Sequence, residues 1–158
     1  MKRLYILCEG QTEYDFISMI LSPYLQSIDV IVIPIICTTK ITPTKKYKGG
    51  VTNFTKIKKE LQRLCGEHRN EMVTTMFDLY AFPYDALDLQ DIPTDVYAKV
   101  KHIERAISGF SKVTDGIDVA EIIGIEKITA ECLHFANWLA KLTTWATCPP
   151  GRREEGAQ

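Results

Sequence analysis

The sequence has few histidines and tryptophans, little net charge and no long apolar run. Its 158 residues include only three histidines and two tryptophans, and the formal net charge is −1. No apolar run approaches the roughly 20 residues that a membrane-spanning helix needs. The first apolar run ends at Glu9 after five residues, which is too short for the core of a signal peptide. We therefore expect a cytoplasmic protein that does not contact a membrane.

Closely spaced metal-binding pairs are also missing. The five cysteines are scattered without a CxxC motif, at Cys8, Cys37, Cys65, Cys132 and Cys148. Structural zinc sites use close pairs of cysteine or histidine, so no such site is expected. The odd number and the mostly apolar neighbours are typical of free, buried thiols in a reducing compartment.

What is present is the composition of an ordinary globular domain. Apolar residues make up 46% and charged residues 25% of the chain, and its length is enough for one core. We expect a single domain over residues 1–147. The tail at 148–158, CPPGRREEGAQ, lacks apolar anchors and is expected to be flexible.

Apolar spacing predicts an alternation of strands and helices. Strands are predicted where short runs of β-branched and other apolar residues occur, at 3–8, 30–36 and 72–80. Helices are predicted where apolar residues recur at steps of three or four, at about 12–26, 53–66, 96–107, 118–123 and 126–142. This order predicts an α/β fold with a parallel sheet flanked by helices, followed by a C-terminal helical appendage at about 118–142.

Prolines and glycines modify this prediction in three places. Pro34 lies inside the second predicted strand, which is therefore expected at a sheet edge or at a bulge. Pro23 is expected to kink or end the first helix. The polar stretch 37–52, with Pro43 and a Gly-Gly pair, is predicted to be a loop; residues 81–95 are predicted to be another.

Two acidic residues follow predicted strands. Glu9 comes directly after the first strand, and Asp78 lies near the end of the third. Open α/β sheets bind ligands at the carboxyl ends of their strands. If these two strands are neighbours, both carboxylates meet at one sheet edge, where Mg²⁺ would relieve their repulsion. We then expect them roughly 4 to 6 Å apart.

The same residues have simpler structural interpretations. Glu9 can belong to a turn with Gly10, and Glu13 can complement the dipole of the following helix. From the residues alone, these structural roles of Glu9 and Glu13 are favoured over a ligand site. Asp78 can equally cap a turn or face solvent, and neither interpretation of it is preferred.

Charge is segregated along the chain although the total is near zero. Residues 40–63 contain eight basic residues and one acid, whereas residues 78–95 contain five acids and no base. A lysine-rich helix is usually a solvated face. Beside an acidic metal site, however, such a segment would bind a phosphate backbone.

Residues 118–128, DVAEIIGIEKI, are arranged like a helix-turn-helix with Gly124 at the turn. DNA recognition would require basic or amide side chains at the start of the second helix, where this chain has Glu126. A packing role for these two helices is therefore favoured over DNA recognition. A small DNA-binding regulator is the weakest of the three functional hypotheses; the other two are given below.

Four segments together resemble a bacterial family, the domain-of-unknown-function family 4276, which is grouped with the Toprim-like domains. They are RLYILCEGQTE, KGGV, VTTMFDLYAFP and DGIDVAEIIGIEKITAECLHFANWLAKL, in the family's order from residue 3 to about residue 142. The resemblance implies a compact Toprim-like (Rossmann-like) fold. In Toprim domains, a glutamate after the first strand and a DxD motif after a later strand bind Mg²⁺ for phosphodiester chemistry.

Carried over by position, Glu9 matches that glutamate and Asp78 matches the first acid of DxD. The second acid is missing, because the sequence continues Leu79-Tyr80. Glu13 accompanies Glu9 in the EGQTE pattern and is a candidate supporting metal ligand. The chain also resembles a family member that has lost an internal segment near residues 108–115.

The leading hypothesis is a Mg²⁺-dependent nuclease or a nuclease-related protein. Glu9 and Asp78 would be the catalytic and metal-binding residues, and Lys48, Lys56 and Lys59 would hold a DNA or RNA backbone. The resemblance also implies an ATPase partner protein from a bacterial defence system. The alternative is a degenerate Toprim-like module that binds a partner protein or nucleic acid without cutting it.

Overall fold

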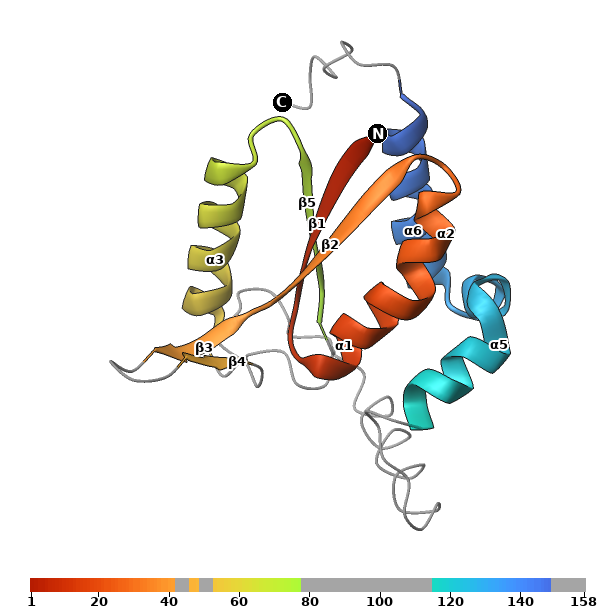
Figure 1. Ribbon diagram of the computed structural model, residues 1–158, viewed down its shortest axis with the longest axis horizontal. Coiled ribbons are helices and arrows are strands. Elements are labelled where there is room, and N and C mark those ends of the chain that lie inside the picture. The colour runs from red at the N-terminus through yellow and green to blue at the C-terminus, as the bar shows by residue number, and fades with distance from the viewer. Residues whose placement is uncertain (42–45, 49–52, 78–114, 149–158) are drawn as a thin grey trace.

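The computed structural model describes residues 1–41, 46–48, 53–77 and 115–148 (Figure 1). Three strands form a parallel sheet in the order β2-β1-β5. Their bounds are Lys2–Cys8 for β1, Val30–Ile36 for β2 and Met72–Met76 for β5. Helices cover both faces of this sheet, so the predicted α/β fold with a parallel sheet flanked by helices is confirmed.

β1 is the central strand of the described sheet because it is apolar on both faces. Four of its residues are fully buried: Leu4, Ile6, Leu7 and Cys8. Cys8 lies opposite Ile36 of β2 and Met76 of β5, the last residue of each neighbouring strand. The three strands therefore end at the same level, and Glu9 is the first residue beyond β1.

β2 lies at the edge of the described sheet, which explains how it accommodates Pro34. The carbonyl of Asp29 accepts from the Lys2 N–H at 3.0 Å, and the Cys37 N–H donates to the Cys8 carbonyl at 2.8 Å. Odd-numbered residues of this strand therefore direct their backbone groups toward β1. Pro34 is even-numbered and faces away from β1, where the described sheet has no further strand, so its missing N–H interrupts no ladder bond of that sheet. The register stays continuous, which makes the predicted bulge unnecessary.

One face of the sheet carries a continuous helical run of three parts. α1 (Gln11–Phe16), the π-helical turn η1 (Ile17–Leu21) and α2 (Ser22–Gln26) follow one another directly. Pro23 stands in the first turn of α2. Because proline cannot donate to the carbonyl four residues earlier, we attribute the wider π turn before it to this missing bond. The helix predicted at 12–26 is confirmed, and Pro23 does not end it.

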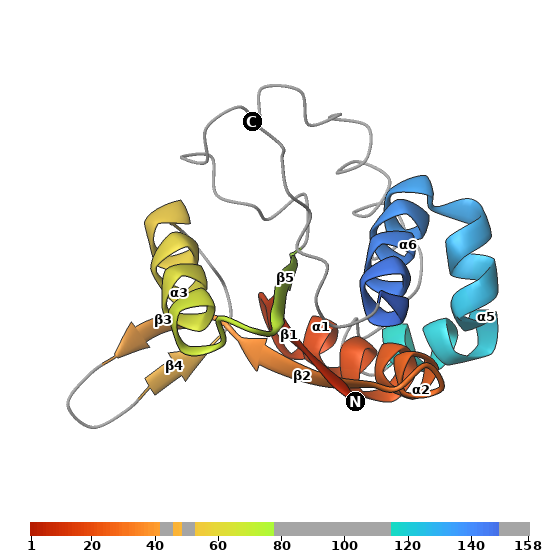
Figure 2. The same ribbon diagram turned by 90° about the horizontal axis from the view of Figure 1, so that it is seen from above.

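Two C-terminal helices, α5 (Asp115–Glu131) and α6 (Leu133–Thr147), pack on this same face (Figure 2). Trp138 of α6 donates from its indole nitrogen to the Thr74 hydroxyl of β5 at 3.0 Å. The Lys2 ammonium donates to the carbonyl of Cys148 at 2.6 Å and also to that of Trp145. The amino end of β1 thus satisfies carbonyl groups at the C-terminus of α6.

The two helices differ from the sequence prediction in one respect. The predicted break at Gly124 is present, with φ 77° and ψ 157°, a conformation that is essentially confined to glycine. The single helix predicted at 126–142 is wrong, because a second break falls at Cys132, whose φ is −118° and ψ 96°. Neither glycine nor proline marks this second break in the sequence.

The opposite face of the sheet is covered by α3 (Phe54–Glu67). Asn53 caps the start of this helix, since its side-chain oxygen accepts from the Thr55 N–H at 2.8 Å. The buried core on this face contains Leu7, Cys37, Ile57 and Leu64. At the other end of α3, the rings of Tyr5 and His68 stack with their centroids 3.7 Å apart.

The loop predicted at 37–52 is partly wrong. β3 (Thr38–Ile41) and β4 (Lys46–Lys48) pair there as a small antiparallel hairpin. Their short sequences, TTKI and KYK, lack the apolar runs from which the other strands were predicted. The loop and helix predicted at 81–107 lie outside the described residues. No helix within the described ranges is long and apolar enough to cross a bilayer.

Candidate functional site

The carboxyl edge of the sheet brings several chain segments together. β1 and β5 end beside the start of α1 (Figure 1). The next residues after the three strands are Glu9, Cys37 and Phe77. We call these three residues the strand-end region. Their position is the one at which open parallel sheets bind ligands.

Glu9 lies at this edge, directly after β1. The residue is half-buried, and its Oε2 atom is inaccessible to solvent. Glu9 follows Cys8, whose carbonyl accepts from the Cys37 N–H at 2.8 Å, so Glu9 and Cys37 are neighbours at the end of the sheet. The charge of Glu9 is one of the influences that raise the pKa of Cys37, after burial and Glu60. A carboxylate that is partly removed from water interacts more strongly with a cation than a solvated one does.

Glu13 closes the first turn of α1. Its Oε2 atom accepts from the Gly10 N–H at 3.0 Å, and the Gly10 carbonyl accepts from the Tyr14 N–H at 3.2 Å. An acidic side chain at this position satisfies a terminal N–H group and complements the helix dipole. The structure therefore supports the simpler of the two interpretations of Glu13, while its role as a supporting metal ligand stays a prediction.

The two cysteines at this edge are core residues. Cys8 and Cys37 are fully buried. Burial, with the nearby Glu13 carboxylate second, raises the pKa of Cys8 to about 12; burial, with Glu60 second, raises that of Cys37 to about 11. Because the thiolate is the reactive form of cysteine, both thiols are inert at neutral pH.

The cysteines were predicted to be free and buried. The prediction of free thiols is confirmed, but only some of the five side chains are buried. All five cysteines are free. Cys65 and Cys132 are exposed, and Cys148 is half-buried. Cys65 is exposed because it lies on the outer side of α3. Cys132 is exposed at the break between α5 and α6.

The first turns of α3 bring positive charge to the same edge. Lys56, Lys58 and Lys59 are exposed on these turns. The charge of Lys56 acts to lower the pKa of Cys37, against the larger effects of burial and Glu60. α3 begins toward the carboxyl ends of the strands (Figure 1), and Lys56 belongs to its first turn. Two of the predicted backbone-binding residues, Lys56 and Lys59, thus belong to a helix start beside the candidate site.

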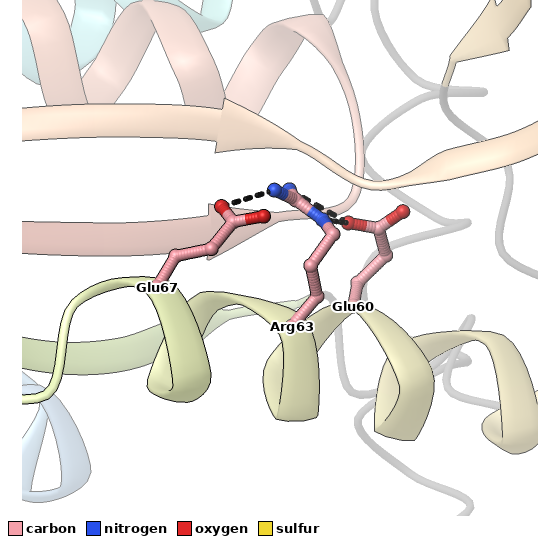
Figure 3. Close-up of polar contacts among 3 residues, drawn as sticks. All are labelled: Glu60, Arg63 and Glu67. Carbon is pink, nitrogen blue, oxygen red and sulfur yellow. Dashed lines mark hydrogen bonds and ion pairs between the residues drawn. The ribbon is translucent and has the colours of Figure 1, made fainter.

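The next basic residue of α3 is neutralised by its neighbours. Arg63 lies between Glu60 and Glu67 and contacts their carboxylates at 3.0 and 2.6 Å (Figure 3). These hydrogen bonds, the one to Glu67 first, raise the pKa of the guanidinium. Since two carboxylates surround one cation, the positive field of α3 comes from its first two turns.

The condition for bringing Glu9 and Asp78 together is met by the strand order. β1 and β5 are parallel neighbours, with Cys8 opposite Met76. Asp78, the second residue after β5, lies outside the described residues, so the predicted separation of the carboxylates stays a prediction. Lys48 is the last residue of β4, but the structure describes only its backbone. Within the described ranges, no group of three or more histidine, cysteine, aspartate or glutamate side chains is placed to hold a metal ion.

Cys37 and Lys58 belong to this edge but were not proposed as site residues from the sequence. The signal for Cys37 was present, because the run VIVIPIIC ends there in the same way that LYILC ends before Glu9. Lys58 was counted only as part of the basic segment, since its orientation on α3 depends on packing that the sequence pattern does not fix.

Comparisons with curated proteins and with solved structures find no match. The family described as "Domain of unknown function (DUF4276)" matches two overlapping segments, residues 8–109 and 98–143. These segments cover most of the 158 residues and include every residue of the candidate site. The chain therefore belongs to the DUF4276 family.

Proposed function

We propose that this protein cleaves phosphodiester bonds with Mg²⁺ at the carboxyl edge of its sheet, as a Toprim-like nuclease. The observation that carries this proposal is the parallel pairing of β1 with β5, in which Cys8 lies opposite Met76. Glu9 and Asp78 follow these two residues by one and two positions. Neighbouring strand ends of this kind are the usual place for ligands in open α/β sheets.

The chemistry of the donor set is suited to Mg²⁺. This ion is commonly bound by one or two carboxylates, with phosphate groups of the substrate and water as its other ligands. Glu9 and Asp78 would hold it, and Glu13 would support them. When bound, the ion supplies neutralisation of phosphate charge and lowers the pKa of an attacking water.

The protein's own side chains would bind and orient the nucleic acid. Lys56 and Lys59, which are exposed on the first turns of α3, would contact phosphates next to the strand-end region, and Lys48 at the end of β4 would extend this contact. Glu9, with one carboxylate oxygen inaccessible to solvent, would act as a general acid/base or as a metal ligand.

A second candidate function is binding without cleavage. Tyr80 takes the place of the second acid in the DxD pattern. This departure favours a degenerate module that would use the basic start of α3 to hold nucleic acid or an ATPase partner of a defence system.

Cleavage assays on supercoiled plasmid DNA and on single-stranded RNA separate these functions. We expect cleavage with Mg²⁺ that is lost with EDTA and falls by about 100-fold or more in Glu9→Gln and in Asp78→Asn. Glu131→Gln is the control, because Glu131 forms an exposed ion pair with Lys127 away from the sheet edge.

Each outcome decides between the proposals. Nucleic-acid binding without cleavage, equal in the wild-type protein and Glu9→Gln, would support the non-catalytic module. Cleavage that survives both Glu9→Gln and Asp78→Asn would place the activity elsewhere. If the protein neither binds nor cleaves either substrate, both nucleic-acid proposals are contradicted.

A further inference from the structure

α5 carries large apolar side chains on its solvent side. Val119 is 46% exposed, Ile122 is 85% exposed and Ile123 is 45% exposed. Their spacing of three and four residues places them on one face of the helix. We call these three residues the α5 patch. Seven large apolar residues are exposed in the described part of the chain, and the α5 patch accounts for three of them.

The fold itself does not require this patch. The helical segment before the break at Gly124 already buries Ile117, and Ile125, just after the break, belongs to the main core. By comparison, α3 buries Ile57 and Leu64 and has no large apolar residue among those exposed. An ordinary surface helix has one apolar stripe that faces the core. α5 carries the α5 patch in addition to its buried residues, and it lies at the outside of the molecule (Figure 2).

Acidic side chains border the α5 patch. Asp118 and Glu121 are exposed, and Asp118 is one turn from Ile122 on the same helix. The segment 115–123 contains three acidic residues and no lysine or arginine. The surface is therefore an apolar stripe with a negative margin.

We propose that the α5 patch is a docking surface for a basic amphipathic helix of a partner protein. The apolar face of such a helix would cover Ile122 and its neighbours, and its lysine or arginine side chains would pair with Asp118 and Glu121. This inference does not depend on Glu9, on Mg²⁺ or on nuclease activity.

The acidic side chains that border the α5 patch argue against two other occupants. A symmetric contact between two copies would bring Asp118 and Glu121 of one chain toward the same carboxylates of the other, which is unfavourable. Nucleic acid would meet the same repulsion. A basic helix is the occupant whose apolar and charged groups both match the surface.

Binding of a defined peptide to the full chain tests the proposal. The probe is a fluorescein-labelled helix of about 18 residues with leucine on one face and lysine on the other, followed by fluorescence anisotropy. We expect saturable binding that weakens by about tenfold in Ile122→Gln and less in Glu121→Gln. Binding should also weaken when NaCl is raised from about 50 to about 300 mM.

Matched controls separate the patch from general effects. Ile31→Thr changes an exposed apolar residue on β2, and Glu67→Gln changes an exposed acid on α3; neither variant should alter binding. A second peptide with glutamate in place of lysine should not bind. Circular dichroism and thermal unfolding confirm that each variant is folded.

A photo-crosslinking group in place of Ile122 identifies the occupant. Benzoylphenylalanine at this position should crosslink to the basic peptide. Crosslinking within the chain or to a second copy, in the presence of that peptide, would overturn the proposal. Absence of saturable binding, or equal binding by Ile122→Gln and the wild-type protein, would overturn it too.

Discussion

At the scale of single residues, the candidate site depends on which groups lose contact with water. Glu9 and Cys37 lie close together at the end of the sheet, and burial is the main reason that the pKa of Cys37 rises to about 11. The position of Glu9 after a buried strand was visible in the sequence. Its proximity to Cys37 was not, because it depends on the pairing of β1 with β2 and on the packing of α3.

The buried thiols give a pH-dependent prediction. The pKa values of Cys8 and Cys37 are raised from 9.0 to about 12 and about 11. The folded protein therefore retains protons that the unfolded chain loses above pH 9. Stability from these groups is complete below that pH and is lost as pH rises through 11 to 12. The free energy of unfolding in urea should decrease over this window in the reduced protein.

Substitution of one thiol tests the cause of that decrease. Cys37→Ala should reduce the slope of the free energy of unfolding against pH between about pH 9 and 11, although it lowers stability at every pH by loss of packing. Cys65→Ala is the control, since that thiol is exposed, and its slope should equal that of the wild-type protein. Identical slopes for Cys37→Ala and the wild-type protein would show that this thiol is not responsible.

At the scale of elements, local signals located most of the helices and strands. Apolar spacing located α3, and Pro34 indicated a sheet edge or a bulge for β2, because a proline is tolerated only where no ladder bond is needed. The β3-β4 hairpin was missed because its strands are short and polar. The break at Cys132 was missed because tertiary packing, and not a helix-breaking residue, sets the direction of α6.

The break within α5 gives a prediction at this scale. Gly124 has φ 77° and ψ 157°, so an alanine there would be strained. Gly124→Ala should lower the free energy of unfolding by about 1 to 3 kcal/mol. Urea unfolding followed by circular dichroism measures this change.

Gly66→Ala is the matched control for Gly124→Ala. Gly66 lies within α3, and a Cβ atom at this position would meet no atom within 4 Å. This variant should be more stable than the wild-type protein by about 0.5 to 1 kcal/mol, because alanine favours the helix. Equal effects of the two substitutions would contradict the assigned conformation of Gly124.

At the scale of the whole molecule, opposite charges lie on opposite sides of the sheet. α3 presents Lys56, Lys58 and Lys59 on one side, and α5 presents acidic residues on the other. The sequence indicated the basic segment but not this arrangement, which follows from the helices that cover each face. The α/β class was predictable from the order of elements, whereas the position of α5 beside α1 required the tertiary structure.

The basic side gives a prediction for nucleic-acid binding. Lys56→Ala with Lys59→Ala should weaken binding to single-stranded DNA and reduce the slope of log K against log salt by about 1.4. The control pair, Lys127→Ala with Lys141→Ala, removes two exposed lysines from α5 and α6 and should leave the slope unchanged. Anisotropy titrations at several salt concentrations provide the slope, and equal slopes in the two double variants would argue against α3 as the binding face.

The central claim is that two carboxylates, one after β1 and one after β5, form a single cation site at the edge of the sheet. Direct titration with Mn²⁺, followed by electron paramagnetic resonance of the free ion, tests it without requiring activity. We expect one site in the wild-type protein and in Glu131→Gln, and its loss in both Glu9→Gln and Asp78→Asn. Retention of that site in either of the latter two variants, or its absence from the wild-type protein, would contradict the claim.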